Sequence, residues 1–154
     1  MKEIGVIQLL ELITKDLIQL NIEATDREDA IRKAAQPLVE ANKITDSYVD
    51  GIIKSMKESG PYFVIIPHVA MPHARPEEGA LENAIGITTL KTPIEFMNAS
   101  NDPVKYVLTL SATGNDEHLE TLASLAELVE EESFFELLDK ATSAQEVIDY
   151  LKER

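Results

Sequence analysis

Histidine is scarce in this chain: its 154 residues include three, and one of them lies in a segment rich in proline and charge. The segment MPHARPEEGA (71–80) places His73 directly after Pro72 and two residues before Arg75. At neutral pH an imidazole is mostly uncharged, so a ring nitrogen is free to accept a transferable group. An arginine beside it supplies a forked, permanently charged donor for carboxylate or phosphoryl oxygens. These residue types therefore suit nucleophilic group transfer.

Prolines stiffen the backbone that carries His73. Pro67, Pro72 and Pro76 all fall between an apolar run and Gly79. Pro72 fixes its own φ, lacks an amide donor and pushes the preceding residue toward an extended conformation. The sequence thus predicts a stiff loop that holds the His73 ring in a narrow range of directions.

A second histidine, His118, is predicted to face the same region. Asn115 or Asp116 is a suitable N-cap, which places His118 in the first turn of a helix that follows a strand. Its spacing from Leu122 and Leu125 extends the apolar face of that helix toward the sheet. Because ligands of α/β folds gather at strand ends, His118 and His73 are candidates to meet in one crevice.

Each of these residues also has a structural interpretation. A histidine beside a core strand is often held by a main-chain carbonyl and has no catalytic role. Arg75 alone suits a surface ion pair with Glu77 or Glu78, which would contribute little to stability. The remaining histidine, His68, either reaches the same site or marks the end of a strand.

Three histidines also raise the alternative of a zinc site made by His68, His73 and His118. The chain lacks an HExxH motif or another short-range ligand spacing that would support such a site. It also lacks the G-x-S-x-G elbow of many serine hydrolases and a glycine-rich phosphate loop. The metal site therefore stays the weaker alternative.

Capping pairs and apolar periodicity place the helices. A short helix is expected at 4–13, and a longer one starts at the capping pair Thr25 and Glu28 and bends at Pro37. The other helices are expected from Thr45 or Asp46 to Gly60, after Gly114 with a restart near Ser133, and from the capping pair Ser143 and Glu146 onward.

Runs of β-branched and aromatic residues place the strands between these helices. Strands are expected at 16–22, 62–66 (YFVII), 84–90 and 104–112, with 91–103 a loop that contains at most a short edge strand. Helices alternate with strands, so the predicted class is α/β, with a central mixed sheet of about five strands and helices on both faces. Residues 1–154 are expected to form a single domain.

The composition argues against several classes of function. Fourteen Lys and Arg against 28 Asp and Glu give a net charge of −14, which disfavours nucleic acid and anionic membrane surfaces as partners. The absence of cysteine excludes thiolate catalysis, disulfides and cysteine metal ligands. No apolar stretch approaches the roughly 18 residues of a membrane span, and charges interrupt the N-terminal segment, so neither membrane insertion nor a signal peptide is expected.

Two segments carry a resemblance to a known family. GPYFVIIPHVAMPHARPEEGA (60–80) and NDPVKYVLTLSATGNDEHLETLASLAELV (101–129) resemble the enzyme IIA domain of the mannitol/fructose class of the sugar phosphotransferase system, with the ascorbate-type branch closest. The resemblance covers essentially the whole chain. One departure is Ala74, because members of this family often have glycine directly after the active histidine.

The resemblance implies a phosphoryl relay in the cytoplasm without a cofactor. His73 falls on the family's phosphorylation site and His118 on the histidine that assists it. The implied partners are the histidine phosphocarrier protein, a separate enzyme IIB whose cysteine accepts the phosphoryl group, and indirectly the membrane IIC permease of ascorbate or a related sugar. Arg75 as a phosphoryl stabiliser is our inference from its position alone. A phosphorylation-dependent regulatory module of the same fold is the alternative function.

Overall fold

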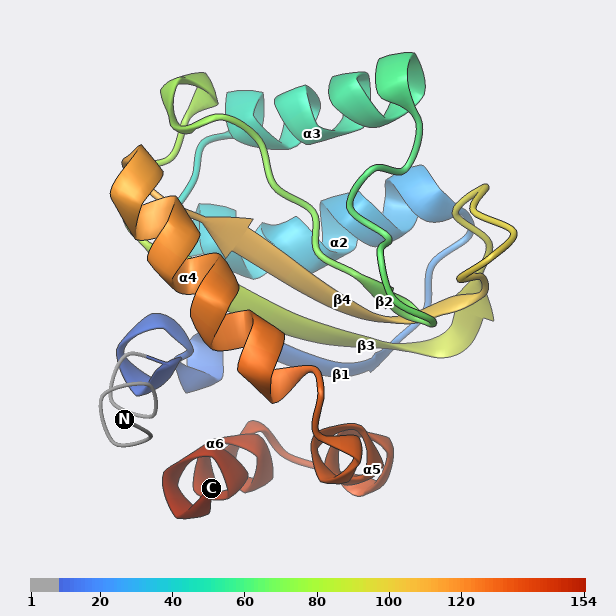
Figure 1. The fold of residues 1–154 in the computed structure, drawn as a ribbon, viewed down its shortest axis with the longest axis vertical. Helices are drawn as coiled ribbons and strands as arrows, with labels where there is room; N and C mark the ends of the chain where they lie inside the picture. The colour runs from blue at the N-terminus through green and yellow to red at the C-terminus, as the bar shows by residue number, and fades with distance from the viewer. Residues whose placement is uncertain (1–8) are drawn as a thin grey trace.

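The computed structural model describes residues 9–154 (Figure 1). Residues 9–12 are helical, and the rest of the helix predicted at 4–13 lies largely outside the described residues. The elements that follow are the 3-10 helix η1 (Lys15–Leu17), β1 (Ile18–Ile22), α2 (Arg27–Glu40), α3 (Asp46–Ser59), β2 (Val69–Ala70), the 3-10 helix η2 (Pro76–Glu78), β3 (Ala84–Ile94), β4 (Val104–Ser111), α4 (Asn115–Leu128), α5 (Glu132–Lys140) and α6 (Ala144–Glu153).

Four strands of the described chain form one mixed sheet in the order β1-β3-β4-β2. β1 runs parallel to β3 and β2 parallel to β4, whereas β3 and β4 are antiparallel. The predicted α/β class with a mixed sheet is confirmed, although about five strands were expected. β3 continues to Ile94, which pairs with Val104, so residues 91–94 extend the strand and do not belong to the predicted loop.

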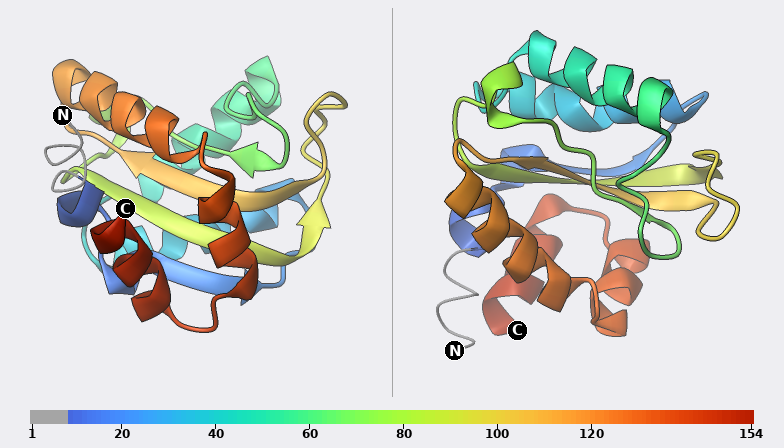
Figure 2. Two further views of the ribbon diagram at one scale, coloured as in Figure 1. Left: turned by 60° about the horizontal axis from the view of Figure 1, so that its bottom comes forward. Right: turned by 45° about the horizontal axis from the view of Figure 1, so that its top comes forward.

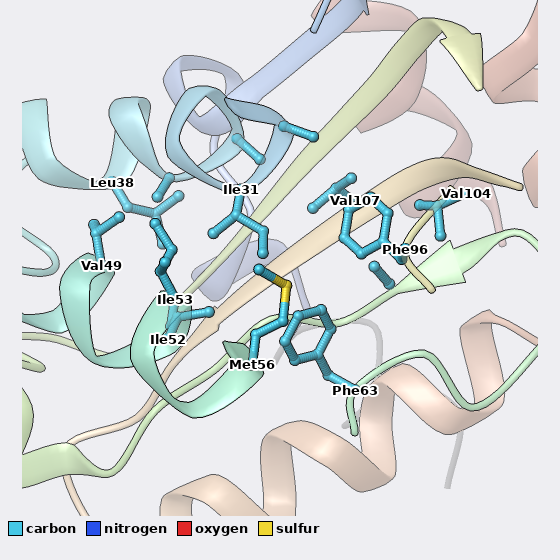
Figure 3. Packing of buried hydrophobic residues seen from close by; sticks show 14 of the residues in the cluster. Ile31, Leu38, Val49, Ile52, Ile53, Met56, Phe63, Phe96, Val104 and Val107 are labelled. Carbon is cyan, nitrogen blue, oxygen red and sulfur yellow. The ribbon is translucent and has the colours of Figure 1, made fainter. Parts of the chain in front are cut away.

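Helices cover both faces of the sheet, as predicted. α2 and α3 lie on one face, and α4, α5 and α6 lie on the other (Figure 2). Leu38 and Met56 from the first pair of helices pack with Val107 of β4 in one hydrophobic core (Figure 3). Phe134 and Val147 belong to a second core on the opposite face. Burial from both sides explains why residues 84–90 of β3 carry no charged side chain and why Lys105 is the one charged residue of β4.

The run YFVII at 62–66 is not a strand, so this prediction is wrong. Phe63 and Val64 are buried, each with 2% exposure, but Phe63 lies in a turn and Val64 in an irregular segment. The Val64 carbonyl accepts hydrogen bonds from the side-chain amides of Asn98 at 2.8 Å and Asn101 at 2.9 Å. Because such partners satisfy the main chain, the run needs no neighbouring strand. Apolar periodicity alone does not separate a buried turn from a short strand.

The cap of α2 lies one residue later than the predicted pair of Thr25 and Glu28. Asp26 Oδ1 accepts from the Asp29 amide at 2.8 Å, and Asp29 Oδ2 accepts from the Thr25 amide at 2.9 Å. Two aspartates thus make the reciprocal contacts that the sequence pattern assigned to threonine and glutamate. Aspartate is as good an N-cap as threonine, and the sequence offers both registers.

Replacing Asp26 with alanine should lower the free energy of unfolding by about 1 kcal/mol, because the Asp29 amide loses its acceptor. Chemical denaturation measures the difference. Asp26→Asn is the matched control, since its amide oxygen still accepts in the same place. Equal stability of Asp26→Ala and the unaltered protein would contradict this assignment of the cap.

α2 continues through Pro37 to Glu40 without interruption. Proline has no amide hydrogen, so the carbonyl of Lys33, four residues earlier, loses its helical partner. The side-chain amide of Gln19 in β1 donates to this Lys33 carbonyl at 2.9 Å. The sheet therefore satisfies the acceptor that proline leaves open, which removes one cost of placing proline in a helix.

Three further predicted helix ends are confirmed. Thr45 Oγ1 accepts from the Tyr48 amide at 3.3 Å, and α3 ends at Gly60, whose φ of 82° is one that glycine adopts readily. Ser143 and Glu146 form the predicted capping box at the start of α6. Within residues 9–154, no helix is both long enough and apolar enough to cross a membrane.

Candidate functional site

His73 lies in the segment that leaves β2 and passes the end of the sheet. The Leu110 amide of β4 donates to the Pro72 carbonyl at 3.0 Å, which ties this segment to β4 beyond the end of β2. The Nδ1 atom of His73 lies 2.8 Å from the Met71 carbonyl oxygen. A carbonyl only accepts, so Nδ1 carries the ring proton and Nε2 keeps a free lone pair. Local hydrogen bonding therefore leaves Nε2 as the ring nitrogen that is able to act as a nucleophile.

Two tyrosines hold the peptide group that joins His73 to Ala74. The buried Tyr48 hydroxyl donates to the Leu110 carbonyl at 2.7 Å and accepts from the Ala74 amide at 3.1 Å. The Tyr62 hydroxyl donates to the His73 carbonyl at 2.7 Å, and its ring meets the imidazole edge-on with centroids 5.6 Å apart. Both contacts depend on hydroxyls that stay protonated. Burial raises the pKa of Tyr48 to about 12 and also raises the pKa of Tyr62.

Sequence reasoning missed both tyrosines. Tyr48, Ile52 and Met56 are spaced by four residues along the buried face of α3, so Tyr48 has the position of an ordinary core residue. Tyr62 lies in the run that was predicted to be a strand. A tyrosine in an apolar stripe signals only that its hydroxyl needs a partner, and the sequence does not say which.

Ala74 needs no glycine at its position. Positive φ values occur at four non-glycine residues of the described chain, and Ala74 is not one of them. Its backbone is therefore compatible with a Cβ atom, and its amide is anchored on Tyr48. The departure from the family's common glycine thus places no strain on the loop.

His118 lies beside His73, as the sequence predicted. Their ring centroids are 5.1 Å apart, and the ring planes are inclined at 48°. α4 begins from Gly114, which makes no side-chain cap, so the predicted caps Asn115 and Asp116 are wrong; both lie inside the first turn. Burial, and second the charge of His73, lower the pKa of His118. Two imidazoles this close do not readily carry two positive charges, so the neutral form of His118 is favoured in the free protein.

A pocket of about 450 Å³ opens beside the two histidines. Its walls come from the C-terminal part of α3, the segment around and after His73, and the start of α4. Its lining residues are Ser55, Ser59, Tyr62, His73, Ala74, Arg75, Pro76, Glu78, Asn115 and His118. Hydroxyls, imidazoles, one guanidinium and one carboxylate line this pocket, whose volume is in the range of ligand-binding sites.

Arg75 lines this pocket as well, and the ion pair with Glu77 or Glu78, which was its alternative structural interpretation, is not formed. The ion pairs within residues 9–154 do not include Arg75. Glu78 Oε2 instead accepts from the main-chain amide of Arg75 at 3.2 Å. The structure thus brings three of the predicted residues, His73, Arg75 and His118, to one pocket.

His68 does not join them. It precedes β2, has a φ of 70°, and its Nδ1 contacts the Pro103 carbonyl at 2.8 Å. His73 lies beyond the other end of the same strand, and the pocket lining does not contain His68. Residues 9–154 hold no cluster of three His, Cys, Asp or Glu side chains able to bind a metal ion. The three-histidine zinc site is therefore wrong, and the structural interpretation of His68 fits its contacts.

Comparison with known proteins identifies the family to which this chain belongs. Residues 11–154 match the family described as "Phosphoenolpyruvate-dependent sugar phosphotransferase system, EIIA 2". The chain belongs to this family. The resemblance inferred from the two sequence segments is thereby confirmed, and this EIIA protein is a phosphoryl carrier of the sugar phosphotransferase system (PTS).

Several named proteins are similar to this EIIA chain over most of its length. The ascorbate-specific PTS system EIIA component of Salmonella choleraesuis is 36% identical over 141 residues, which cover 91% of this chain and 92% of the relative. The mannitol-specific cryptic phosphotransferase enzyme IIA CmtB of Escherichia coli has a TM-score of 0.84 at 33% identity, covering 95% of this chain and 99% of the other. Enzyme IIAMTL of Escherichia coli, in its complex with phosphorylated enzyme IIBMTL, has a TM-score of 0.79 at 26% identity, covering 92% and 98% of the two chains.

Proposed function

We propose that His73 Nε2 accepts a phosphoryl group from the phosphohistidine of the phosphocarrier protein and passes it to the cysteine of an enzyme IIB. In the first step the donor's N–P bond breaks as the bond from His73 Nε2 to phosphorus forms. In the second, the cysteine thiolate forms an S–P bond and His73 recovers its lone pair. The proton on Nδ1 stays in place through both steps.

One observation carries this proposal: the Nδ1 proton of His73 is engaged by the Met71 carbonyl, 2.8 Å away, in a pocket shared with His118. The contact fixes the tautomer and the direction of the ring, as a relay through one nitrogen requires. Tyr62 and Tyr48 hold the adjoining main chain, so little reorganisation accompanies attack. Phosphoryl transfer spreads negative charge over three equatorial oxygens. The protein therefore needs only to position the reacting groups and to neutralise that charge.

His118 is assigned the assisting role. Its ring lies 5.1 Å from that of His73, near enough for a phosphoryl oxygen on Nε2 to accept a hydrogen bond from it. A protonated His118 would neutralise part of the charge on the transferring group. The first amides of α4, which begin beside the pocket at Asn115, favour negative charge in the same place.

Membership of the family and the composition support the proposed partners and pathway. These 154 residues contain no cysteine, so they do not supply the IIB thiol themselves, and we expect a separate enzyme IIB to be the acceptor. Similarity to the ascorbate-specific component of Salmonella choleraesuis supports a role in uptake of ascorbate or a related sugar, with residues 1–154 acting as a single cytoplasmic domain. The sugar itself contacts the membrane IIC subunit, and this EIIA chain contacts only proteins.

NMR of the phosphorylated protein tests the proposed atom. A phosphoryl group on Nε2 lies three bonds from both ring C–H protons, whereas one on Nδ1 lies three bonds from a single ring proton. We therefore expect two proton–phosphorus correlations to the His73 ring after incubation with phosphoenolpyruvate, enzyme I and the phosphocarrier protein. A single correlation, or a phosphoryl group on another residue, would contradict the proposal.

Transfer to a purified enzyme IIB separates the relay from the regulatory alternative. A relay protein should lose its phosphoryl group to the IIB cysteine in a single-turnover mixture. Stable retention of the group in the presence of every candidate IIB encoded beside the gene would favour the regulatory module.

A further inference from the structure

We propose that Arg75 binds the phosphoryl group on His73 and serves as its permanent countercharge in the pocket. This inference rests on the proposed acceptor role of His73 and extends it to the residue that recognises the phosphorylated state. A guanidinium is suited to this task because its fork contacts two phosphoryl oxygens at once.

The backbone of Arg75 is held beside the imidazole. It lies two residues after His73 and lines the same pocket. Its φ of −71° and ψ of 145° are extended, and Pro76 follows it at the first position of the 3-10 helix η2. Proline restricts the residue before it to extended conformations, so the base of the arginine side chain varies little in direction.

The charges around the pocket leave a place for an anion. Among its lining residues Arg75 is the single Lys or Arg, and Glu78 is the single carboxylate. Burial and the charge of His73 lower the pKa of His118, so this ring adds little positive charge before phosphorylation. A phosphoryl group brings almost two negative charges into the pocket. Without Arg75 those charges would face Glu78 with no permanent cation beside them.

Contacts of Glu78 explain why its carboxylate does not neutralise Arg75. Glu78 Oε2 accepts from the Arg75 main-chain amide at 3.2 Å. The same carboxylate packs against α3 so closely that a Cβ atom on Gly51 would lie 2.9 Å from Oε2. Glu78 is thus held by the main chain and by α3, and the guanidinium of Arg75 forms no ion pair within residues 9–154.

Other cations near this wall of the pocket are engaged or lie outside it. Lys57 of α3 pairs with Glu28 at 2.7 Å. Lys54, also on α3, is exposed and does not line the pocket. Among residues 9–154, Arg75 is therefore the lysine or arginine available to a phosphoryl group on His73.

Titration of the phosphoryl group tests this proposal directly. A bound guanidinium favours the dianion, so it lowers the pKa of the phosphoryl group. In phosphorylated Arg75→Gln, phosphorus NMR should show this group titrating about one pH unit higher than in the unaltered phosphoprotein. The rate of phosphoryl acceptance should fall about tenfold, and Arg75→Lys should recover part of the titration shift through its single point charge. Lys54→Gln is the matched control, because it removes one exposed positive charge outside the pocket and should leave the titration unchanged.

Each of the other possible outcomes would give Arg75 a different role. A phosphoryl titration unchanged in Arg75→Gln, with a raised KM for the phosphocarrier protein, would make Arg75 a docking contact and overturn the proposal. An unchanged titration and an unchanged KM would make it a solvent-facing surface residue. If the unaltered protein shows no phosphohistidine on His73, the proposed function fails first and this inference falls with it.

Discussion

The His73→Ala protein is expected to gain no phosphoryl group from phosphoenolpyruvate, enzyme I and the phosphocarrier protein. The substitution removes the one ring nitrogen that the Met71 contact leaves free in the pocket. His118 cannot replace it, because it projects from α4 and its ring centroid lies 5.1 Å from that of His73. In-line transfer tolerates little displacement of the acceptor, so a ring this far away meets the phosphorus in the wrong place. The mass of the intact protein before and after incubation measures the result.

A matched variant separates loss of the acceptor from loss of the fold. His68→Asn changes the histidine at the opposite end of β2, and asparagine tolerates the φ of 70° at that position. This control should be phosphorylated as fully as the unaltered protein. Both variants should unfold cooperatively, since the His73 side chain is only partly buried and belongs to neither core. An acid-labile phosphoryl group on the His73→Ala protein would refute the assignment.

Sequence analysis predicted the helices best where a cap and an apolar stripe coincide. α3 and α6 begin at the predicted caps Thr45 and Ser143 because a side-chain oxygen and a free amide lie close in sequence. The run at 62–66 was misassigned because the partners of the Val64 carbonyl, Asn98 and Asn101, lie more than 30 residues away in the chain. No local pattern contains such a contact.

Part of the site, too, could be predicted from the sequence. His73 and His118 could be placed together because each follows a strand and the ends of neighbouring strands lie close in space. Two further details depend on the three-dimensional arrangement of the chain. The tautomer of His73 depends on the direction of the Met71 carbonyl, and the anchoring of Ala74 depends on Tyr48, a residue in an otherwise ordinary core stripe. Sequence spacing does not encode these directions.

Replacing His118 with alanine should slow phosphoryl acceptance about 100-fold while leaving His73 able to carry the group. The variant loses the donor nearest to the oxygens of the transferring group and keeps the nucleophile. Single-turnover kinetics with phosphorylated phosphocarrier protein measure the rate, and full phosphorylation at long times shows that His73 is intact. His118→Gln is the matched variant, because it keeps an uncharged amide donor and should recover part of the rate. A rate equal to that of the unaltered protein would exclude an assisting role for His118.

The extent of phosphorylation should depend on pH through the protonation of His118. In the free protein, burial and the charge of His73 lower the pKa of His118. A phosphoryl group on His73 brings negative charge beside His118, so the pKa of His118 should rise on phosphorylation. Between the two pKa values the phosphorylated form then binds more protons, so by linkage lower pH favours phosphorylation across that window. NMR titration of the His118 ring in both forms measures the shift. The corresponding part of the pH dependence of the transfer equilibrium should disappear in His118→Ala, which an indirect structural role for this residue would not produce.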